Sequence, residues 1–502
     1  MEEVDVAIIG GGLLGCFTAR RLMRYTLKVA LIEKNTDVCA EISRANTSIV
    51  YSGYDNKPGS LKARMCASAN HGFGRLCEEL SVCFKRCGSL MAAKGPRSES
   101  VLRRKLEDGA KNGVPGLRLI TGEEARSLEP NLSPDVTHAL YSPSTGTVNP
   151  WELGIAALEN AVDNGARLFL NREVTGVSYA AGVYIIQTGG AGGAGGAGAA
   201  GGAVFAARSV INCAGLFADK VSEMISPPYF KILPTRGDYI VLDTKARDVI
   251  SHVVFLEPEE RGKGATLVPT VDGNIMLGPS EEELTGEKDF STTASGLSFV
   301  RGIAGEIVPA IPFEHAIRSF GAIRPNPFWT EKDATGNLVL SNRSINDFPI
   351  GAPPGHPLFI NVPGVKTPGL TCADEIGNYV AQMLLERLGP VPLNPRYDPA
   401  RPAKPRFSRL APREKLDLAG RQNIVCRCRE VTESEVRAAV RRTAGARTVD
   451  GVKRRTGACM GRCQGGFCTQ RIIEILAEEL GESVSDIRKE GKCSYLIRGG
   501  GT

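Results

Sequence analysis

Apolar residues at the start of the chain follow the pattern of a strand, a helix and a second strand. Residues 4–9 and 29–32 are mostly apolar, as in strands that are buried on both faces. Between them, residues 13–25 place apolar side chains at helical spacing. This order predicts a βαβ unit, so we expect the chain to begin with an α/β domain.

The middle of the chain is richer in strands. Residues 230–243 and 265–278 have the composition of strands, and a helix is predicted over residues 292–307. This pattern is typical of an antiparallel sheet that forms part of a substrate domain.

A tract of almost pure glycine and alanine runs from residue 189 to residue 203. It lies between one strand that ends near residue 188 and another over residues 204–212, which predicts an extended, mobile hairpin tip. A ligand-binding glycine loop is disfavoured, because the tract lacks polar side chains and no helix follows it.

A change in composition marks a boundary near residue 390. Seven prolines between residues 390 and 412 predict a semi-rigid linker over residues 390–420. Residues 421–502 then form a small domain, in which Thr432 and Glu435 have the spacing of a capping box at the start of a helix.

Composition and charge restrict the function further. The 502 residues require two or three domains, and none of the apolar runs is long enough to span a bilayer, although peripheral membrane association stays open. The acidic residues 1–5 do not resemble a signal or transit peptide, so we expect a reducing compartment, the cytoplasm or an organelle. A net charge of +6 without an arginine or aromatic stripe gives no support for nucleic acid binding.

A dinucleotide-binding motif follows the first strand. Gly10, Gly12 and Gly15 match G-x-G-x-x-G at the start of the predicted helix. They permit a tight turn, the approach of a pyrophosphate and close packing of helix on strand. Glu33 ends the second strand, where a carboxylate binds ribose hydroxyls. The motif alone does not distinguish FAD from NAD.

Further segments in the same order extend the pattern. They are S-R-A-N-T-S at 43–48, G-Y-D at 53–55, P-G-S-L-K-A at 58–63, V-I-N-C-A-G-L at 210–216, P-T-R-G-D-Y at 234–239, F-G-A-I-R-P at 320–325 and residues 361–371. Together they resemble the superfamily of FAD-dependent glycerol-3-phosphate dehydrogenases and D-amino-acid oxidases, over roughly residues 1–390.

The resemblance implies FAD as the cofactor. It also implies a Rossmann-like FAD domain within residues 1–389, with FAD-binding parts at about 1–85, 145–228 and 335–389 and substrate parts at about 86–144 and 229–334. Besides the glycine motif and Glu33, the implied FAD-binding residues are Ser43, Asn46, Thr47, Ser48, Ala214, Gly215, Gly369, Leu370 and Thr371.

The same resemblance identifies candidate substrate residues. Arg324 matches the arginine that holds the anionic end of the substrate, and Arg236 resembles a second phosphate contact. A guanidinium group offers two parallel hydrogen bonds to a phosphate or carboxylate, although either arginine could instead form a structural salt bridge. Tyr51 and Tyr239 stand where relatives often have histidines, which leaves the catalytic base open. No histidine of this chain falls in a recognised catalytic segment.

Cysteines gather near the C-terminus. Cys426, Cys428, Cys463 and Cys468 resemble the ligands of a domain related to bacterioferritin-associated ferredoxin, with Cys459 as an extra cysteine. That domain is small and helical and binds a [2Fe-2S] cluster, whose irons each need two protein ligands. A four-cysteine zinc site uses the same kind of ligand and stays open here.

These features predict an enzyme. We expect it to oxidise sn-glycerol 3-phosphate to dihydroxyacetone phosphate, with electrons passing from FAD through the cluster to a protein or quinone acceptor. The alternatives are a 2-hydroxy-acid dehydrogenase, acting for example on 2-hydroxyglutarate, an amino-acid dehydrogenase, and a flavin-linked protein of iron–sulfur or metal delivery. A basic group in the last domain could favour an acidic acceptor or be a solvated face: Arg437, Arg441, Arg442, Arg447, Lys453, Arg454 and Arg455.

Overall fold

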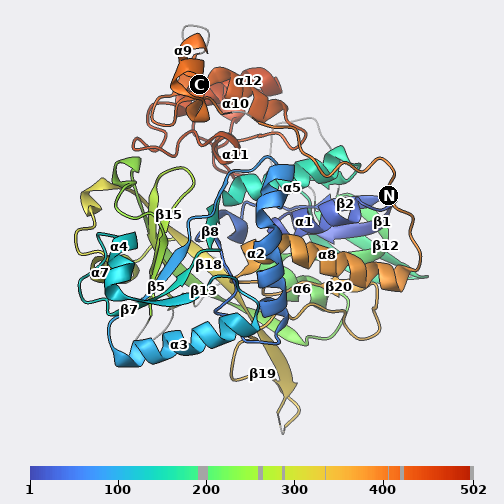
Figure 1. Ribbon diagram of the computed structural model, residues 1–502. Helices are drawn as coiled ribbons and strands as arrows, with labels where there is room; N and C mark the ends of the chain where they lie inside the picture. Colours follow the sequence, from blue (N-terminus) through green and yellow to red (C-terminus); the bar gives the residue numbers. More distant parts are fainter. Residues whose placement is uncertain are drawn as a thin grey trace.

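The computed structural model describes residues 1–189, 202–257, 264–284, 289–333, 335–404, 406–418 and 423–497. It shows a mixed α/β fold with a small C-terminal domain that contains helices (Figure 1). Most of the glycine and alanine tract, residues 190–201, lies outside the described residues, and so does the predicted hairpin tip. The two strands that flank the tract, β11 (Val183–Gly189) and β12 (Val204–Asn212), pair in the antiparallel sense.

The first sheet carries the predicted βαβ unit. Its strands lie in the order β10-β11-β12-β1-β2-β9, with β20 beside β12. The central strand β1 (Glu2–Ile9) runs parallel to β2 and β12, and its apolar residues are buried as the sequence predicts. The other strands are β2 (Val29–Ile32), β9 (Arg167–Phe169), β10 (Glu173–Ala180) and β20 (Phe359–Asn361).

Three helices pack together beside this sheet. Helix α1 (Leu13–Leu22) follows β1 and lies against both α5 (Pro150–Asp163) and α8 (Gly369–Leu388), which come from distant parts of the chain. Their apolar faces form one core with β1 and β2. The remaining helices of the first 389 residues, apart from α7, are α2 (Leu61–Glu79), α3 (Pro96–Lys111), α4 (Gly122–Leu128) and α6 (Ala218–Glu223).

A second sheet forms the predicted β-rich domain. Its order is β19-β18-β13-β16-β15-β14-β5-β7-β6, with β17 beside β13, and its neighbours are antiparallel except for the parallel pair of β14 and β5. The strand-rich residues 265–278 form a hairpin of two strands, β15 and β16. The strands are β5 (Ser89–Ala93), β6 (Arg118–Thr121), β7 (His138–Ser142), β13 (Phe230–Leu242), β14 (Val253–Leu256), β15 (Thr266–Pro269), β16 (Ile275–Gly278), β17 (Glu282–Glu283), β18 (Ala316–Lys332) and β19 (Leu338–Leu340).

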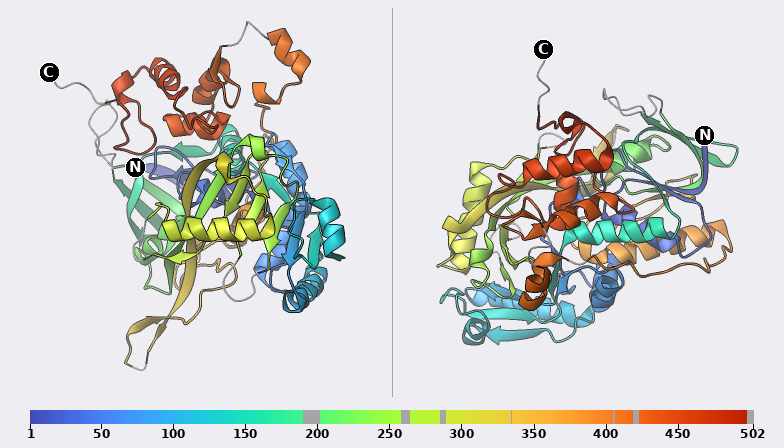
Figure 2. Two further views of the ribbon diagram at one scale, coloured as in Figure 1. Left: turned by 90° about the vertical axis from the view of Figure 1, so that its left-hand side faces the viewer. Right: turned by 90° about the horizontal axis from the view of Figure 1, so that it is seen from above.

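Other elements complete this region. Helix α7 (Ala294–Ile307) starts after Thr293, whose hydroxyl accepts a hydrogen bond from Gly296 N, close to the predicted helix start. The β18–β19 hairpin extends away from the rest of the molecule (Figure 2) and reaches past residue 334, where the sequence had placed a domain boundary. A small sheet joins β3 (Ile49–Val50), β4 (Phe84–Lys85) and β8 (Gly146–Val148).

The C-terminal domain packs on the first domain, where α11 lies against α5 (Figure 1). Its core is formed by α10, α11, α12 and a short hairpin. The predicted capping box is present, because the Thr432 hydroxyl accepts from Glu435 N and the Glu435 carboxylate accepts from Thr432 N. The elements are β21 (Ile424–Cys426), β22 (Val431–Thr432), α10 (Glu433–Arg441), α11 (Val449–Thr456) and α12 (Thr469–Leu480).

The proline-rich segment before this domain is held against the first domain. Arg401 is 2% exposed and donates to Glu159 Oε2 at 2.6 Å, while Arg406 donates to Glu152 Oε2 at 2.6 Å. Both carboxylates belong to α5. A short helix, α9 (Pro412–Leu418), then begins at a proline, as helices often do.

Candidate active site and cysteine cluster

The turn after β1 requires glycine at two positions. Gly10 has φ +105°, and a Cβ atom there would lie 2.5 Å from the carbonyl oxygen of Cys213. At Gly15 a Cβ atom would lie 2.0 Å from the carbonyl oxygen of Gly10. The helix therefore packs on the strand at a distance that only glycine allows, as the motif predicts.

The third glycine of the motif lies at the N-terminus of α1. Gly12 is the N-cap residue, and the first turn contains no acidic side chain. Leu13 N donates to Ser43 Oγ at 3.0 Å, so a hydroxyl of the predicted flavin loop reaches the start of the helix. The N–H groups of the first helical turn, the helix dipole and this hydroxyl together suit the pyrophosphate of a dinucleotide.

Glu33 lies at the carboxyl end of β2, beside this turn. Its Oε2 atom accepts from Gly11 N at 2.7 Å, and its Oε1 atom accepts from Asn35 N at 2.8 Å. Burial raises the pKa of Glu33, which is 7% exposed. The side chain is thus fixed where the sequence predicts a contact to ribose.

Two predicted flavin segments meet at β3. Asn46 Oδ1 accepts from Ser48 N at 2.8 Å, and the Thr47 hydroxyl lies 3.4 Å from the Tyr51 hydroxyl. Tyr51 N donates to Thr371 Oγ1 at 2.9 Å, across 320 residues of sequence. The segment over 43–51 and the start of α8 are therefore neighbours, as expected if both border one cofactor.

A third segment follows β12. The Asn212 amide donates to Asn361 Oδ1 at 2.6 Å and its oxygen accepts from Ala214 N at 3.2 Å, while Gly215 has φ +56°. This turn leaves the sheet at the carboxyl end of the strand, the edge at which ligands bind in such sheets. Two other predicted residues, Gly369 and Leu370, form the first turn of α8.

The predicted substrate residues lie on one face of the β13–β18 pair, with one exception. Arg324 is opposite Thr235, and Tyr239 is opposite Phe320, so alternation along the strands directs these side chains to the same face. The Tyr239 and Phe320 rings are stacked at 4.8 Å between centroids. Arg324 lies close enough to Tyr239 and Tyr51 for its charge to lower the pKa of each hydroxyl group, against the effect of burial.

The Arg324 guanidinium group is mostly buried. Its Nη1 atom is inaccessible to water and makes no hydrogen bond, although it lies 3.0 Å from Glu281 Oε1, an ion-pair distance. A buried donor without a hydrogen bond is costly unless another group uses it. An anionic ligand would use it, in competition with the half-exposed Glu281 carboxylate.

Both tyrosines stay protonated at neutral pH. Removal of water from around the hydroxyl group raises the pKa of Tyr51 to about 12. Burial also raises the pKa of Tyr239, against the opposing effect of the Arg324 charge. Their hydroxyl groups can therefore donate hydrogen bonds to a ligand.

Arg236 is the exception, because the structure does not bring it to Arg324. It is opposite Ile323 in the strand pair and therefore points to the other face of the sheet. Its guanidinium group binds Glu282 Oε2 at 2.6 Å and Asp289 Oδ2 at 2.5 Å. In this structure Arg236 forms the structural salt bridge that the sequence left as an alternative.

Two residues that the sequence did not single out lie beside Arg324. Asn326 donates to Thr235 Oγ1 at 3.0 Å and accepts from Lys366 Nζ at 2.7 Å. Asn326 is two positions beyond Arg324, so strand alternation could have indicated that they share a face. Lys366 belongs to the predicted final flavin segment, but only the fold shows that its side chain lies beside Asn326 and Arg324.

Five cysteines come together in the C-terminal domain. Cys428 and Cys463 are exposed, with 3.7 Å between their sulfur atoms. Cys459 and Cys468 are buried, with 3.4 Å between theirs, and the Cys426 thiol interacts with Cys468. Within the described ranges, no group of three or more His, Cys, Asp or Glu side chains is arranged to hold a single metal ion.

Comparisons with known proteins agree with this geometry. Residues 5–383 match the family model described as FAD dependent oxidoreductase. The chain belongs to this family. Residues 424–478 match a second model, the BFD-like [2Fe-2S] binding domain, so this FAD-dependent oxidoreductase carries an iron–sulfur domain behind its catalytic part.

Individual relatives have related activities. A glycerol 3-phosphate dehydrogenase from Caloramator mitchellensis is 40% identical over 499 residues, which are 99% of this chain and 98% of the relative. A human mitochondrial L-2-hydroxyglutarate dehydrogenase is 30% identical over 284 residues, 56% of this chain and 61% of the relative. The FAD-bound L-α-glycerophosphate oxidase of Mycoplasma pneumoniae is 25% identical, has a TM-score of 0.70, and covers 80% of this chain and 99% of its own.

FAD and the cluster both fit the residues of this FAD-dependent oxidoreductase. A Cβ atom at Gly12 would approach Ser43 Oγ to 3.2 Å and narrow the space at the start of α1 where a pyrophosphate would lie. The exposed and buried cysteines offer sulfur atoms in two sets, which suits a cluster with two irons. Among the described helices, none is both long and apolar enough to cross a membrane.

Proposed function

We propose that the protein oxidises sn-glycerol 3-phosphate to dihydroxyacetone phosphate. Electrons would then leave FAD through a [2Fe-2S] cluster on Cys426, Cys428, Cys463 and Cys468 to a protein or quinone acceptor. The observation that carries the proposal is the buried Nη1 atom of Arg324, which makes no hydrogen bond, on the sheet face that also carries Tyr239 and near Tyr51. The 40% identity to a glycerol 3-phosphate dehydrogenase over nearly the whole chain supports the choice of substrate.

In this proposal, Arg324, Tyr239 and the neighbouring residues each make a specific contact with the substrate. Arg324 binds the phosphate through two parallel hydrogen bonds, and Lys366 adds positive charge nearby. The protonated hydroxyls of Tyr51 and Tyr239 orient the substrate hydroxyl and cannot take its proton, which would pass to water as the hydride leaves. When bound, FAD supplies the acceptor for the hydride that leaves the substrate carbon. Arg236 does not contact the substrate in this proposal, because its side chain lies on the other face of the sheet.

A contact between the two domains supports the electron route. Arg318 of β18 donates to Gln464 Oε1 at 3.1 Å, and Gln464 follows Cys463 in the cluster loop. Two residues further along β18, Phe320 stacks on Tyr239. Two strand residues span about 7 Å, so the cluster loop approaches the substrate face over a short distance.

A substrate panel tests this proposal. The protein is purified without oxygen, and its absorption spectrum is recorded before and after addition of glycerol 3-phosphate, L-2-hydroxyglutarate or amino acids. We expect glycerol 3-phosphate to bleach the flavin band and the other compounds to leave it. If glycerol 3-phosphate causes no bleaching, the proposal fails.

A 2-hydroxy-acid dehydrogenase is the second candidate. Arg324 would bind a carboxylate as well as a phosphate, and the partial match to an L-2-hydroxyglutarate dehydrogenase favours this substrate among acids. Bleaching by L-2-hydroxyglutarate alone in the same panel would replace the first proposal with this one.

For the protein's surroundings, we propose a reducing compartment such as the cytoplasm, in which free thiols persist to bind iron. Peripheral association with a membrane would bring the cluster domain to a quinone. Sedimentation with lipid vesicles at low and high salt tests that association.

A further inference from the structure

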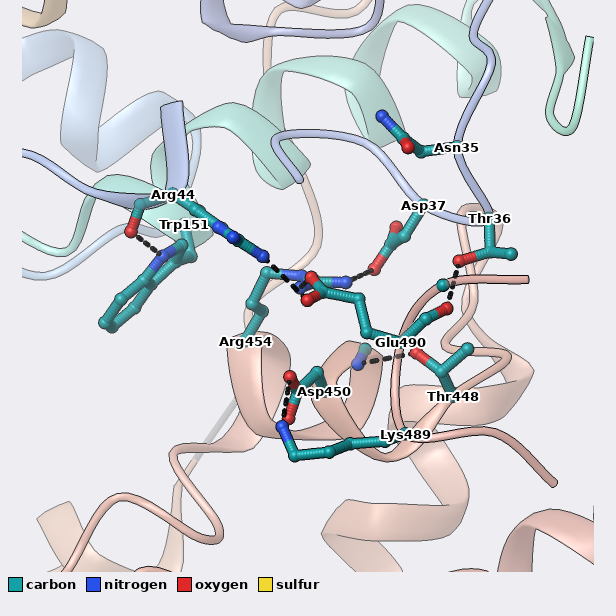
Figure 3. Close-up of polar contacts among 12 residues, drawn as sticks. Asn35, Thr36, Asp37, Arg44, Trp151, Thr448, Asp450, Arg454, Lys489 and Glu490 are labelled. Atoms are coloured by element: carbon teal, nitrogen blue, oxygen red, sulfur yellow. Dashed lines mark hydrogen bonds and ion pairs between the residues drawn. The ribbon is translucent and has the colours of Figure 1, made fainter. Parts of the chain in front are cut away.

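Glu490, near the end of the described chain, lies beside the loop that contains Asn35, Thr36 and Asp37 (Figure 3). Thr36 Oγ1 donates to the carbonyl oxygen of Glu490 at 2.8 Å. The Glu490 side chain accepts from Arg44 at 2.7 Å and from Arg454 at 2.7 Å, and so joins the first domain to α11. The cluster domain is therefore fixed to a segment that the FAD site needs.

A buried group of charges strengthens this contact. Asp37 of the loop accepts from Arg454 Nη2 at 2.9 Å and from Arg455 at 2.7 and 2.8 Å. All three side chains are at most 5% exposed. The two guanidinium groups hold the pKa of the Asp37 carboxyl well below its usual range. Asp37 is therefore ionised at neutral pH, so the ion pairs with both arginines are charged there.

The loop held in this way also supports the glycine turn. Asp37 Oδ1 accepts from Val38 N at 2.8 Å, and Cys39 N donates to the carbonyl oxygen of Gly11 at 2.9 Å. Gly11 N in turn donates to Glu33 Oε2. These hydrogen bonds, together with the short stretch of backbone from Asp37 to Cys39, connect the arginines of α11 to the dinucleotide motif.

A pocket lies between the two domains at this point. It has a volume of about 210 Å³. One side is formed by the residues that directly follow Glu33, and another side by Glu173 at the start of β10. Its lining residues are Lys34, Asn35, Thr36, Glu173, Gly491 and Lys492. Because Glu33 is the residue expected to bind ribose, the pocket lies where the adenine ring would follow.

We propose that the cluster domain closes the adenosine end of the FAD site. Gly491 and Lys492 form one wall of the adenine pocket, and Glu490 fixes this wall to Thr36 and Arg44. Arg454 and Arg455 hold the opposite loop through Asp37. The domain that takes electrons from the flavin then also retains the cofactor. This role depends on FAD binding and on no particular substrate.

The test compares FAD with FMN, which lacks the adenosine half. Apoprotein of the full chain is prepared for the wild type, Glu490→Ala and Lys492→Ala, and binding is followed by quenching of flavin fluorescence. We expect about tenfold weaker FAD binding in Glu490→Ala, a smaller loss in Lys492→Ala, and unchanged FMN binding in both. The rate of FAD release from the holoprotein should rise by a similar factor.

Arg441→Gln is the matched control, since it breaks an ion pair with Glu479 inside the cluster domain. It should leave FAD binding unchanged. Unchanged FAD binding in the two test variants would overturn the proposal, and so would an equal loss for FAD and FMN, because that reports general damage. If Glu490→Ala does not fold, Lys492→Ala decides alone. These results do not depend on the substrate panel.

Discussion

At the scale of single residues, the proposed function assigns the anionic group of the substrate to Arg324. The described part of β18 directs two arginines, Arg318 and Arg324, to the face that carries Tyr239. Arg318 binds Gln464 of the cluster loop, so Arg324 is the arginine that lies beside the tyrosines. The Glu281 carboxylate lies at ion-pair distance from its Nη1 atom and would compete with an anionic ligand. Substrate affinity should therefore respond in opposite directions to changes at these two positions.

Arg324→Lys should raise KM for glycerol 3-phosphate about 10- to 100-fold, because an ammonium group cannot form the paired hydrogen bonds of a guanidinium group. Glu281→Gln should lower KM by a few-fold, since it removes the competing charge. Steady-state kinetics with an artificial acceptor measures both. Equal KM values for Arg324→Lys and the wild type would exclude Arg324 as the anion contact.

Tyr51 gives a prediction about alkaline stability. Its pKa is about 12 in the folded protein and about 10 in an unfolded chain, so between these values only the unfolded state ionises. Folding stability is therefore lost as the pH rises from 10 to 12. Urea unfolding at pH 9 and pH 11 should show that the wild type loses about 1 kcal/mol more than Tyr51→Phe. Identical losses would contradict the raised pKa.

The cysteines differ in their expected roles. Cys428→Ser should abolish the cluster, because it removes one of two exposed sulfur atoms that lie 3.7 Å apart. Cys459→Ser should retain it, because Cys426 and Cys468 remain at the buried end. Iron content and visible absorption after anaerobic purification distinguish the two. A cluster that is lost from Cys459→Ser and kept in Cys428→Ser would reverse the proposed ligand set.

At the scale of elements, the capping box at the start of α10 is a feature that the sequence predicts and the structure contains. Thr432→Ala removes the hydroxyl that caps the helix and should destabilise the cluster domain by about 1 kcal/mol. Thermal unfolding followed by circular dichroism, in parallel with Thr335→Ala in an exposed turn, measures this loss. An equal effect of the two substitutions would argue against the cap.

Elements with local signals could be predicted from the sequence. The βαβ unit, the glycine turn and the α10 cap depend on residues within about 30 positions of each other. Strand alternation also carried information about the site, because Arg236 and Tyr239 are three positions apart and cannot share a face of one strand. The partners that neutralise Arg236 could not be predicted, since Glu282 and Asp289 lie 46 and 53 residues away.

At the scale of the whole molecule, the position of the cluster domain depends on ion pairs between residues that are far apart in the sequence. Asp37 and Arg455 are 418 residues apart, and their ion pair was not predictable from either neighbourhood. The arginines of the last domain were expected to meet an acceptor or solvent. Arg454 and Arg455 instead bind the first domain, whereas Arg437 and Arg441 pair with glutamates of α12.

The central claim is that glycerol 3-phosphate reduces FAD and that the cluster receives the electrons. Anaerobic protein mixed with glycerol 3-phosphate, frozen after increasing times and examined by electron paramagnetic resonance tests this claim most directly. We predict a reduced [2Fe-2S] signal that appears as the flavin absorption falls, in the wild type and not in Cys428→Ser. Flavin bleaching without any cluster signal in the wild type would contradict the account.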